Sequence, residues 1–114
     1  MAFGFNRNNN DESRAAGFQD FLIEGEYIEQ IYKLQLDFAA LTNLRLIFID
    51  NNLGSNKKVV TSIPYSKIEV ISIDEGTLSD EVEIATKHKA YKLKFYKGTD
   101  VLGFYNTLAK HICK

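Results

Sequence analysis

The sequence predicts a mainly β domain, an antiparallel sandwich or partly open barrel of six to seven strands, capped by one C-terminal amphipathic α-helix. Three observations predict this fold class. Short apolar runs alternate with a period of two as far as residue 95, turn-forming residues separate them, and the period changes to 3.6 after residue 98. Because no strand–helix–strand alternation occurs, a parallel α/β fold with its phosphate-binding turns is not expected.

Length and composition point to a single folded unit. The chain has 114 residues, of which 45% are apolar and 25% charged, ordinary values for a globular domain with one core. We expect residues 15–114 to form this domain. Residues 1–14 are expected to form a flexible tail that is polar from residue 6 onward, with Phe3 and Phe5 either free or docked on a neighbour.

Six runs of β-branched, aromatic and aliphatic residues have the length of strands. They predict strands at residues 31–36, 44–49, 57–62, 68–73, 81–86 and 91–95. Residues 36–41 are interpreted as the loop between the first two strands. The Asn- and Gly-rich residues 50–56 predict a hairpin tip, and Pro64, which lacks an amide donor, predicts a strand end or corner.

The helix is predicted from Thr99, a suitable N-cap, with Asp100 at its positive end. Its apolar stripe is expected to pack on the sheets and comprises Val101, Leu102, Tyr105, Leu108, Ala109 and Ile112. Combined with the strand alternation, it predicts a core of Leu34, Leu36, Leu46, Phe48, Leu93, Phe95, Leu102, Tyr105 and Leu108.

Several short motifs occur in a fixed order along the chain. They are Gly25-Glu26, Asp37, the run 41–47 with Asp50, Lys57-Lys58 and the run 62–68. This ordered set, spanning about residues 22–112, resembles the bacterial pleckstrin-homology-like (PH-like) domain family. The family's usual turn is Gly-x-x-Gly-Lys-Lys, whereas Asn56 replaces the second glycine here; Asn also accepts the left-handed conformation. The resemblance implies a scaffold for interaction, often homo-oligomeric, with no agreed catalytic activity or cofactor.

The polar residues of these motifs are interpreted as structural rather than ligand-binding. Asp37 and Thr42 are expected to hydrogen-bond a turn between the first two strands. Arg45 is expected to pair with Asp50 or Glu26 across a strand, since isolated polar residues in strands usually satisfy neighbours.

No pattern of catalytic or metal-ligating residues emerges. His88 and His111 are far apart in sequence, the only cysteine is Cys113, and no Gly-x-Ser-x-Gly turn or zinc spacing is present. We therefore predict no catalytic residue, metal or cofactor, and a small hydrolase remains only a remote alternative. The lone cysteine and the lack of an apolar leader or spanning segment lead us to expect a cytoplasmic protein.

The leading functional hypothesis is protein binding with homo-oligomeric assembly. Ile47 and Ile49 lie opposite Leu46 and Phe48 on the same predicted strand, so we interpret them as a solvent-side apolar surface and a candidate interface. The alternative is that the chain itself covers both faces of the sheet, for instance with its C-terminal helix.

The second hypothesis is contact with anionic lipid headgroups or an acidic partner. The formal net charge is −1, so no global attraction to nucleic acid or an anionic membrane is expected, and nucleic acid is not predicted as a partner. The loop at residues 36–41 has an acid and no base, which makes a phosphoinositide pocket improbable. One basic surface remains, a strand face that either contacts anions weakly or is simply solvated. It is formed by Lys87, Lys89, Lys92, Lys94 and Lys97.

Overall fold

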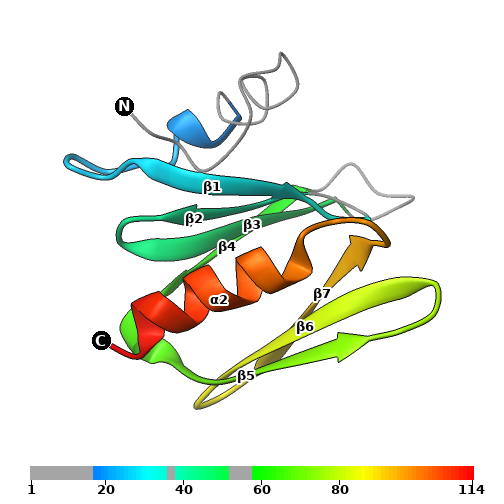
Figure 1. Cartoon of the computed structure of the whole chain (residues 1–114). Helices are drawn as coiled ribbons and strands as arrows, with labels where there is room; N and C mark the ends of the chain where they lie inside the picture. The colour runs from blue at the N-terminus through cyan, green and yellow to red at the C-terminus, as the bar shows by residue number, and fades with distance from the viewer. Residues whose placement is uncertain (1–16, 36–37, 52–57) are drawn as a thin grey trace.

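Two antiparallel sheets and a C-terminal helix make up the computed structural model, which describes residues 17–35, 38–51 and 58–114 (Figure 1). The first sheet has the order β1 (Ile28–Lys33), β2 (Phe38–Thr42), β3 (Arg45–Asn51) and β4 (Lys58–Pro64). A short 3-10 helix, η1 (Tyr65–Lys67), leads to the second sheet, with the order β5 (Ile68–Glu75), β6 (Ser79–Thr86) and β7 (Ala90–Tyr96). The helix α2 (Val101–Ile112) follows, which confirms the predicted fold class.

β2 is the strand that sequence reasoning missed. The prediction of a loop at residues 36–41 is wrong, because Phe38–Thr42 pairs with β1 on one side and with β3 on the other. Ala39 and Ala40 are completely buried, so both faces of this central strand are covered. Tertiary pairing therefore overrides the weak strand preference of alanine. The absence of a phosphoinositide pocket stays a prediction, since residues 36 and 37 lie outside the described residues.

The inner core lies between the two sheets and under α2. Its buried members are Leu34, Ala39, Leu41, Leu46, Phe48, Ile63, Tyr65, Ile68, Val82, Ile84, Leu93, Phe95, Val101, Phe104 and Leu108. Of the predicted core, Leu34, Leu46, Phe48, Leu93, Phe95 and Leu108 are confirmed. Tyr105 packs against this core while partly exposed, and Leu36 lies outside the described residues.

The helix buries a face slightly rotated from the predicted stripe. The prediction that Leu102 belongs to the core is wrong, because its side chain is 52% exposed. Phe104 is completely buried instead. The buried residues Val101, Phe104 and Leu108 follow the spacing i, i+3, i+7, which places them on one side of the helix. Asp100 caps the helix by accepting a hydrogen bond from the Gly103 amide at 3.0 Å.

A second, outer cluster covers the opposite face of the first sheet. It consists of Phe18, Ile28, Ile31, Ala40, Ile47 and Ile49, with Leu22, Phe38 and Val60 packed against it. The premise that Ile47 and Ile49 face solvent is wrong, since they are 0% and 6% exposed. The chain covers this face itself, with the segment that enters β1 rather than with the C-terminal helix.

The two sheets meet along one side only. Leu34 and Phe95 form an isolated β-bridge, and the Gln35 amide donates to the Lys94 carbonyl at 2.9 Å, so the end of β1 joins β7. On the other side, the described strands leave the outer edges of β4 and β5 without a strand partner. The barrel is therefore partly open, with η1 forming the corner predicted at Pro64.

Candidate interaction surfaces

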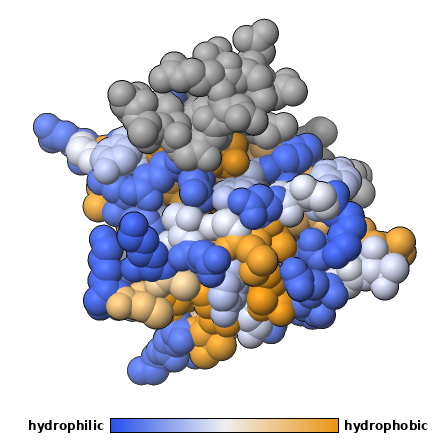
Figure 2. All heavy atoms as spheres, viewed as in Figure 1, coloured by the Kyte–Doolittle hydropathy of each residue, from blue (hydrophilic) through white to orange (hydrophobic). Residues whose placement is uncertain are grey.

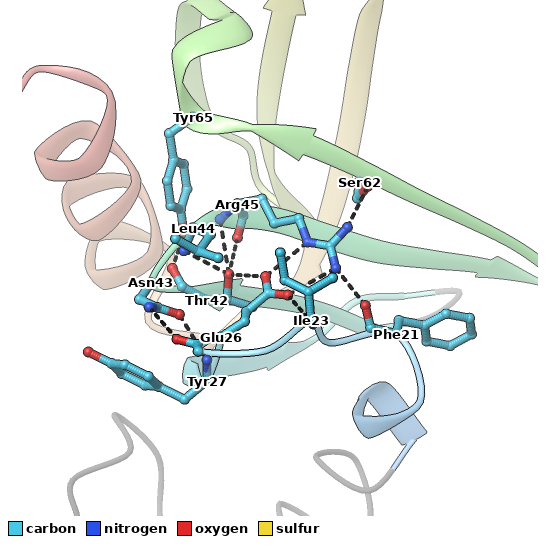
Figure 3. Close-up of polar contacts among 11 residues, drawn as sticks. Phe21, Ile23, Glu26, Tyr27, Thr42, Asn43, Leu44, Arg45, Ser62 and Tyr65 are labelled. Atoms are coloured by element: carbon cyan, nitrogen blue, oxygen red, sulfur yellow. Dashed lines mark hydrogen bonds and ion pairs between the residues drawn. The ribbon is translucent and has the colours of Figure 1, made fainter.

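A buried polar cluster connects the segment before β1 with the turn between β2 and β3 (Figure 3). The Glu26 carboxylate accepts hydrogen bonds from Arg45 Nε at 2.9 Å, from Arg45 Nη2 at 2.9 Å and from the Thr42 hydroxyl at 2.7 Å. The Thr42 hydroxyl in turn accepts the amides of Leu44 and Arg45, at 3.0 and 2.9 Å. We refer to Glu26, Thr42 and Arg45 as the polar clamp.

The polar clamp holds Glu26 as a carboxylate. Burial alone would raise the pKa of Glu26, but the hydrogen bonds from Arg45, Thr42 and the Ile23 amide, together with the Arg45 charge, lower it below its ordinary value. The hydrogen bonds to Glu26 likewise raise the pKa of Arg45, despite the opposing effect of its burial. The pair is ionised at neutral pH.

The clamp fastens several parts of the chain together. Arg45 also donates to the Phe21 carbonyl and to the Ser62 hydroxyl on β4. Asn43 accepts the Tyr27 amide and donates to the carbonyl of Gly25, whose φ of 83° suits glycine. The segment that covers the outer cluster is thus held by charge-assisted and backbone hydrogen bonds.

A second chain of contacts ties the end of α2 to the first sheet. The Tyr65 hydroxyl donates to the Thr42 carbonyl at 2.6 Å, and its ring stacks on His111 at 4.2 Å. His111 Nε2 lies 2.7 Å from a Glu29 carboxylate oxygen. Burial, followed by the charges of Glu29 and Glu26, raises the pKa of Tyr65, so this phenol remains a donor.

The clamp is a structural joint and not an open site. Each of its polar side chains has partners within the chain, so no donor or acceptor is aimed at an empty position. The predicted pairing of Arg45 with Glu26 is confirmed. Thr42 does hydrogen-bond a turn, but this turn joins β2 to β3 rather than the first two strands. Asp37 and the side chain of Asp50 lie outside the described residues.

The described residues contain no group of three or more His, Cys, Asp or Glu that could hold a metal ion. His88 and Cys113 are exposed and lie on different elements. Among the residues that the structure describes, no helix is both long enough and apolar enough to cross a bilayer.

The predicted lysine face is largely balanced by acids on the neighbouring strand. Lys97 pairs with Asp80 at 2.8 Å and Lys94 approaches Glu81 at 3.8 Å. Lys92 stands opposite Glu83 in the β6–β7 register. Lys89 lies over the ring of Tyr91 at 5.0 Å, and Lys87 is exposed. Asp80 is buried, whereas Lys94 and Lys92 lie on an exposed face, where charge pairs solubilise a strand and stabilise it only slightly.

Lysines that lack an acid partner gather instead at the start of β5. Ile68 pairs with Thr86, which brings Lys67 beside the turn that carries Lys87 and Lys89. Within the described part of the chain, none of these three ammonium groups has an ion pair. We refer to Lys67, Lys87 and Lys89 as the basic end. Sequence reasoning missed Lys67, because only the strand register brings it to the other two.

The outer edges of β4 and β5 carry exposed apolar side chains. Val59 on β4 is 46% exposed and Val70 on β5 is 56% exposed. Figure 2 shows apolar side chains at the surface where α2, β5 and β6 lie, interspersed with charged ones. β5 ends in two exposed acids, Asp74 and Glu75, which we refer to as the acidic end.

A four-stranded and a three-stranded antiparallel sheet with a C-terminal capping helix define a pleckstrin-homology-like domain. Sequence comparison agrees, since the family model described as "Bacterial PH domain" matches residues 4–112. The chain belongs to the bacterial PH domain family.

Individual relatives support this assignment over most of the chain. The uncharacterized protein YozO of Bacillus subtilis is 40% identical over 102 residues, covering 87% of this chain and 90% of the relative. The crystal structure of a pleckstrin homology domain from Shewanella amazonensis is similar with a TM-score of 0.76 at 27% identity, covering 91% of this chain and 99% of that one. A pleckstrin-homology domain protein from Shewanella loihica gives a TM-score of 0.73 at 25% identity, with coverages of 92% and 99%. The family and the fold indicate a binding module in the general sense.

Proposed function

We propose that this chain is a non-catalytic protein-interaction module that assembles with copies of itself through the open edges of its sheets. The observation that carries the proposal is the pair of outer edges on β4 and β5, which no described strand covers. Unpaired strand amides and carbonyls bind another strand readily, and apolar side chains beside them add buried area. Val59 and Val70 supply such side chains.

The edges replace Ile47 and Ile49 as the proposed contact surface. Those two isoleucines are buried in the outer cluster, so a partner reaches them only if the covering segment detaches. The polar clamp opposes detachment, since it bonds Glu26 and the Phe21 carbonyl to Arg45. A cytoplasmic location is part of the proposal, consistent with a single unpaired cysteine, and cell fractionation tests it.

Light scattering over a wide range of protein concentration tests self-assembly. The proposal predicts a mass that rises from one chain to a defined multiple as concentration increases. A chain that stays monomeric at the highest soluble concentration contradicts it.

Edge variants identify the surface that is used. Val59→Lys and Val70→Lys each place a charge on an open edge. Natural sheets use such edge charges to prevent pairing with another strand. We expect at least one of them to reduce the assembled fraction while the melting temperature changes little. Leu102→Lys is the matched control, because Leu102 is similarly exposed but lies on α2; an equal loss in this control argues against edge pairing.

A second candidate function is contact with an anionic membrane, favoured by the three unpaired lysines of the basic end. Co-sedimentation with phosphatidylcholine vesicles, with and without phosphatidylserine, tests it. Binding that requires phosphatidylserine and is lost in Lys87→Glu/Lys89→Glu, but kept in Lys92→Glu, supports this function. Equal sedimentation with both vesicle types rejects it.

A further inference from the structure

Exposed apolar side chains gather around the polar clamp. The described residues include nine large apolar side chains that are exposed, and four of these lie beside the clamp (Figure 3). The four are Phe21, Ile23, Tyr27 and Leu44, which are between 39% and 60% exposed. Single exposed apolar residues are normal on a protein surface, whereas a group of them marks an interaction site. We refer to these four residues as the clamp surface.

Buried polar side chains fix the backbone of every member of the clamp surface. The Phe21 carbonyl and the Ile23 amide bond directly to side chains of the polar clamp, the amide at 3.0 Å. The Leu44 amide donates to the clamp's hydroxyl at 3.0 Å. The Tyr27 amide donates at 2.8 Å to the side chain of Asn43, which follows the clamp's threonine in the chain. Residues held in this way lose little conformational freedom when a partner binds, so the clamp surface is preorganised for contact.

The segment that carries most of the clamp surface is acidic. Residues 17–32 contain the exposed acids Asp20 and Glu24 and neither a lysine nor an arginine. Two bases contact this segment, Arg45 and His111, and each is already engaged by a glutamate of the segment. Within the described part of the chain, Asp20 and Glu24 have no ion pair, so both carboxylates are left for a cation of a partner.

We infer that the clamp surface binds a segment of a different protein in which lysine or arginine side chains flank apolar ones. Contact with Ile23 and Tyr27 removes apolar surface from water, and Asp20 and Glu24 supply the charged rim of such an interface. The same carboxylates repel a nucleic acid or an anionic membrane. The inference goes beyond the proposed self-assembly, because no residue of the clamp surface belongs to β4 or β5.

Titration with synthetic peptides of equal length tests the chemistry of the partner. One peptide combines leucine with lysine, a second replaces each lysine with glutamate, and a third replaces each leucine with serine. Fluorescence anisotropy should show binding of the leucine/lysine peptide, with a dissociation constant at least about tenfold higher for the other two. The inference is overturned if the leucine/lysine peptide does not bind, or if either of the other peptides binds equally well.

Two variants test whether the peptide binds at the clamp surface. Asp20→Lys/Glu24→Lys reverses the charge of the rim, and Ile23→Ser/Tyr27→Ser removes apolar contact. All four side chains are exposed, so both variants are expected to fold as the wild type does. Each should weaken binding of the leucine/lysine peptide by at least about tenfold.

The matched controls change the same kinds of side chain at the β5–β6 turn. Asp74→Lys/Glu75→Lys reverses two exposed acids, and Leu78→Ser removes a side chain that is 88% exposed. Both controls should bind the peptide as the wild type does. A loss equal to that of the clamp-surface variants would reveal non-specific attraction and overturn the inference.

NMR amide shifts distinguish this surface from the one used in self-assembly. The peptide should shift amides of residues 20–27 and 43–44 and leave those of β5 and β6 unchanged. Amides of the clamp surface that shift with protein concentration alone would make a second copy the occupant and overturn the inference of a different protein. A wild type that binds the peptide at these residues but stays monomeric at all concentrations supports this inference and removes the proposed self-assembly.

Discussion

The outer face of β3 and the outer edge of β5 both carry apolar residues, yet the protein treats them differently. On β3, Ile47 and Ile49 lie under Phe18 and Leu22, within a cluster that the polar clamp holds in place. On β5, Val70 is exposed beside backbone groups that no described strand pairs. A short segment of the chain can cover apolar side chains, whereas the unpaired backbone groups of a strand edge bind water unless another strand, a helix or a loop covers them.

This difference separates two kinds of mutational effect. Changes at the covered face or in the core should reduce the stability of the single chain. Changes at the open edge should leave stability almost unaltered and reduce assembly. Variants of the covered face, of the inner core and of the polar clamp test this division, and their expected effects on stability decrease in that order.

Ile47→Glu is expected to have the largest effect. It places a carboxylate at a completely buried position with no cation assigned to it, at a cost of at least ~4 kcal/mol in unfolding free energy, a large share of the total for a domain of this size. Urea unfolding measures the cost, with Ile23→Glu as the control because Ile23 is 60% exposed. A folded Ile47→Glu variant of normal stability would show that the outer face is open.

Phe95→Ala should cost about 3–5 kcal/mol, because it removes a completely buried ring from the inner core. Phe95 packs against Phe104 at 5.1 Å and Tyr32 at 6.2 Å between ring centroids. Chemical denaturation measures the loss, and Leu102→Ala on the exposed side of α2 should change stability far less. Melting within a degree of the wild type would be incompatible with the register of β7.

Arg45→Met should cost about 2–4 kcal/mol, because it leaves the buried Glu26 carboxylate without its cation. The double variant Arg45→Met/Glu26→Gln removes the uncompensated charge and should recover part of this loss. Hydrogen exchange should locate the opening in the segment from residue 17 to residue 27. No difference between single and double variants would mean that the ion pair contributes little.

Acid should weaken the same joint. The folded pKa of Glu26 lies below its ordinary value of 4.5, so the stabilisation is fully present above pH 4.5 and is lost as pH falls through the folded pKa. Stability measured from pH 7 downward should therefore show the wild type losing its advantage over Glu26→Gln only below about pH 4.5. If this stability advantage disappeared between pH 7 and pH 5, the effect would come from a titratable group other than Glu26.

The sequence predicted most of the strands, but it placed an exposed apolar surface at Ile47 and Ile49, which the structure buries. Period-two alternation located six strands, because their apolar residues pack on a partner sheet. It missed β2, whose alanines carry no strand signal and are buried because the inner core covers one face of the sheet and the outer cluster the other. It placed Leu102 rather than Phe104 in the core, because two adjacent apolar positions at the start of a helix leave its rotation undetermined.

The candidate sites were harder to predict than the fold. Apolar residues on both faces of β3 indicate that both faces are covered. The periodicity of the sequence does not identify which segment of the chain covers the outer face. The basic end joins Lys67 to the β6–β7 turn through strand register, which sequence spacing does not encode. The pairing of Arg45 with Glu26 was predictable, because opposite charges flanking neighbouring strands satisfy one another.

Hydrogen exchange at two protein concentrations tests the central claim most directly. Assembly through open edges predicts that amides of β5, and of β4 if that edge is used, exchange more slowly in concentrated than in dilute protein. Amides of the central strands β2 and β3 should exchange at the same rate in both. Equal exchange at the β4 and β5 edges, with protection appearing instead over residues 17–27 or α2, would contradict the account.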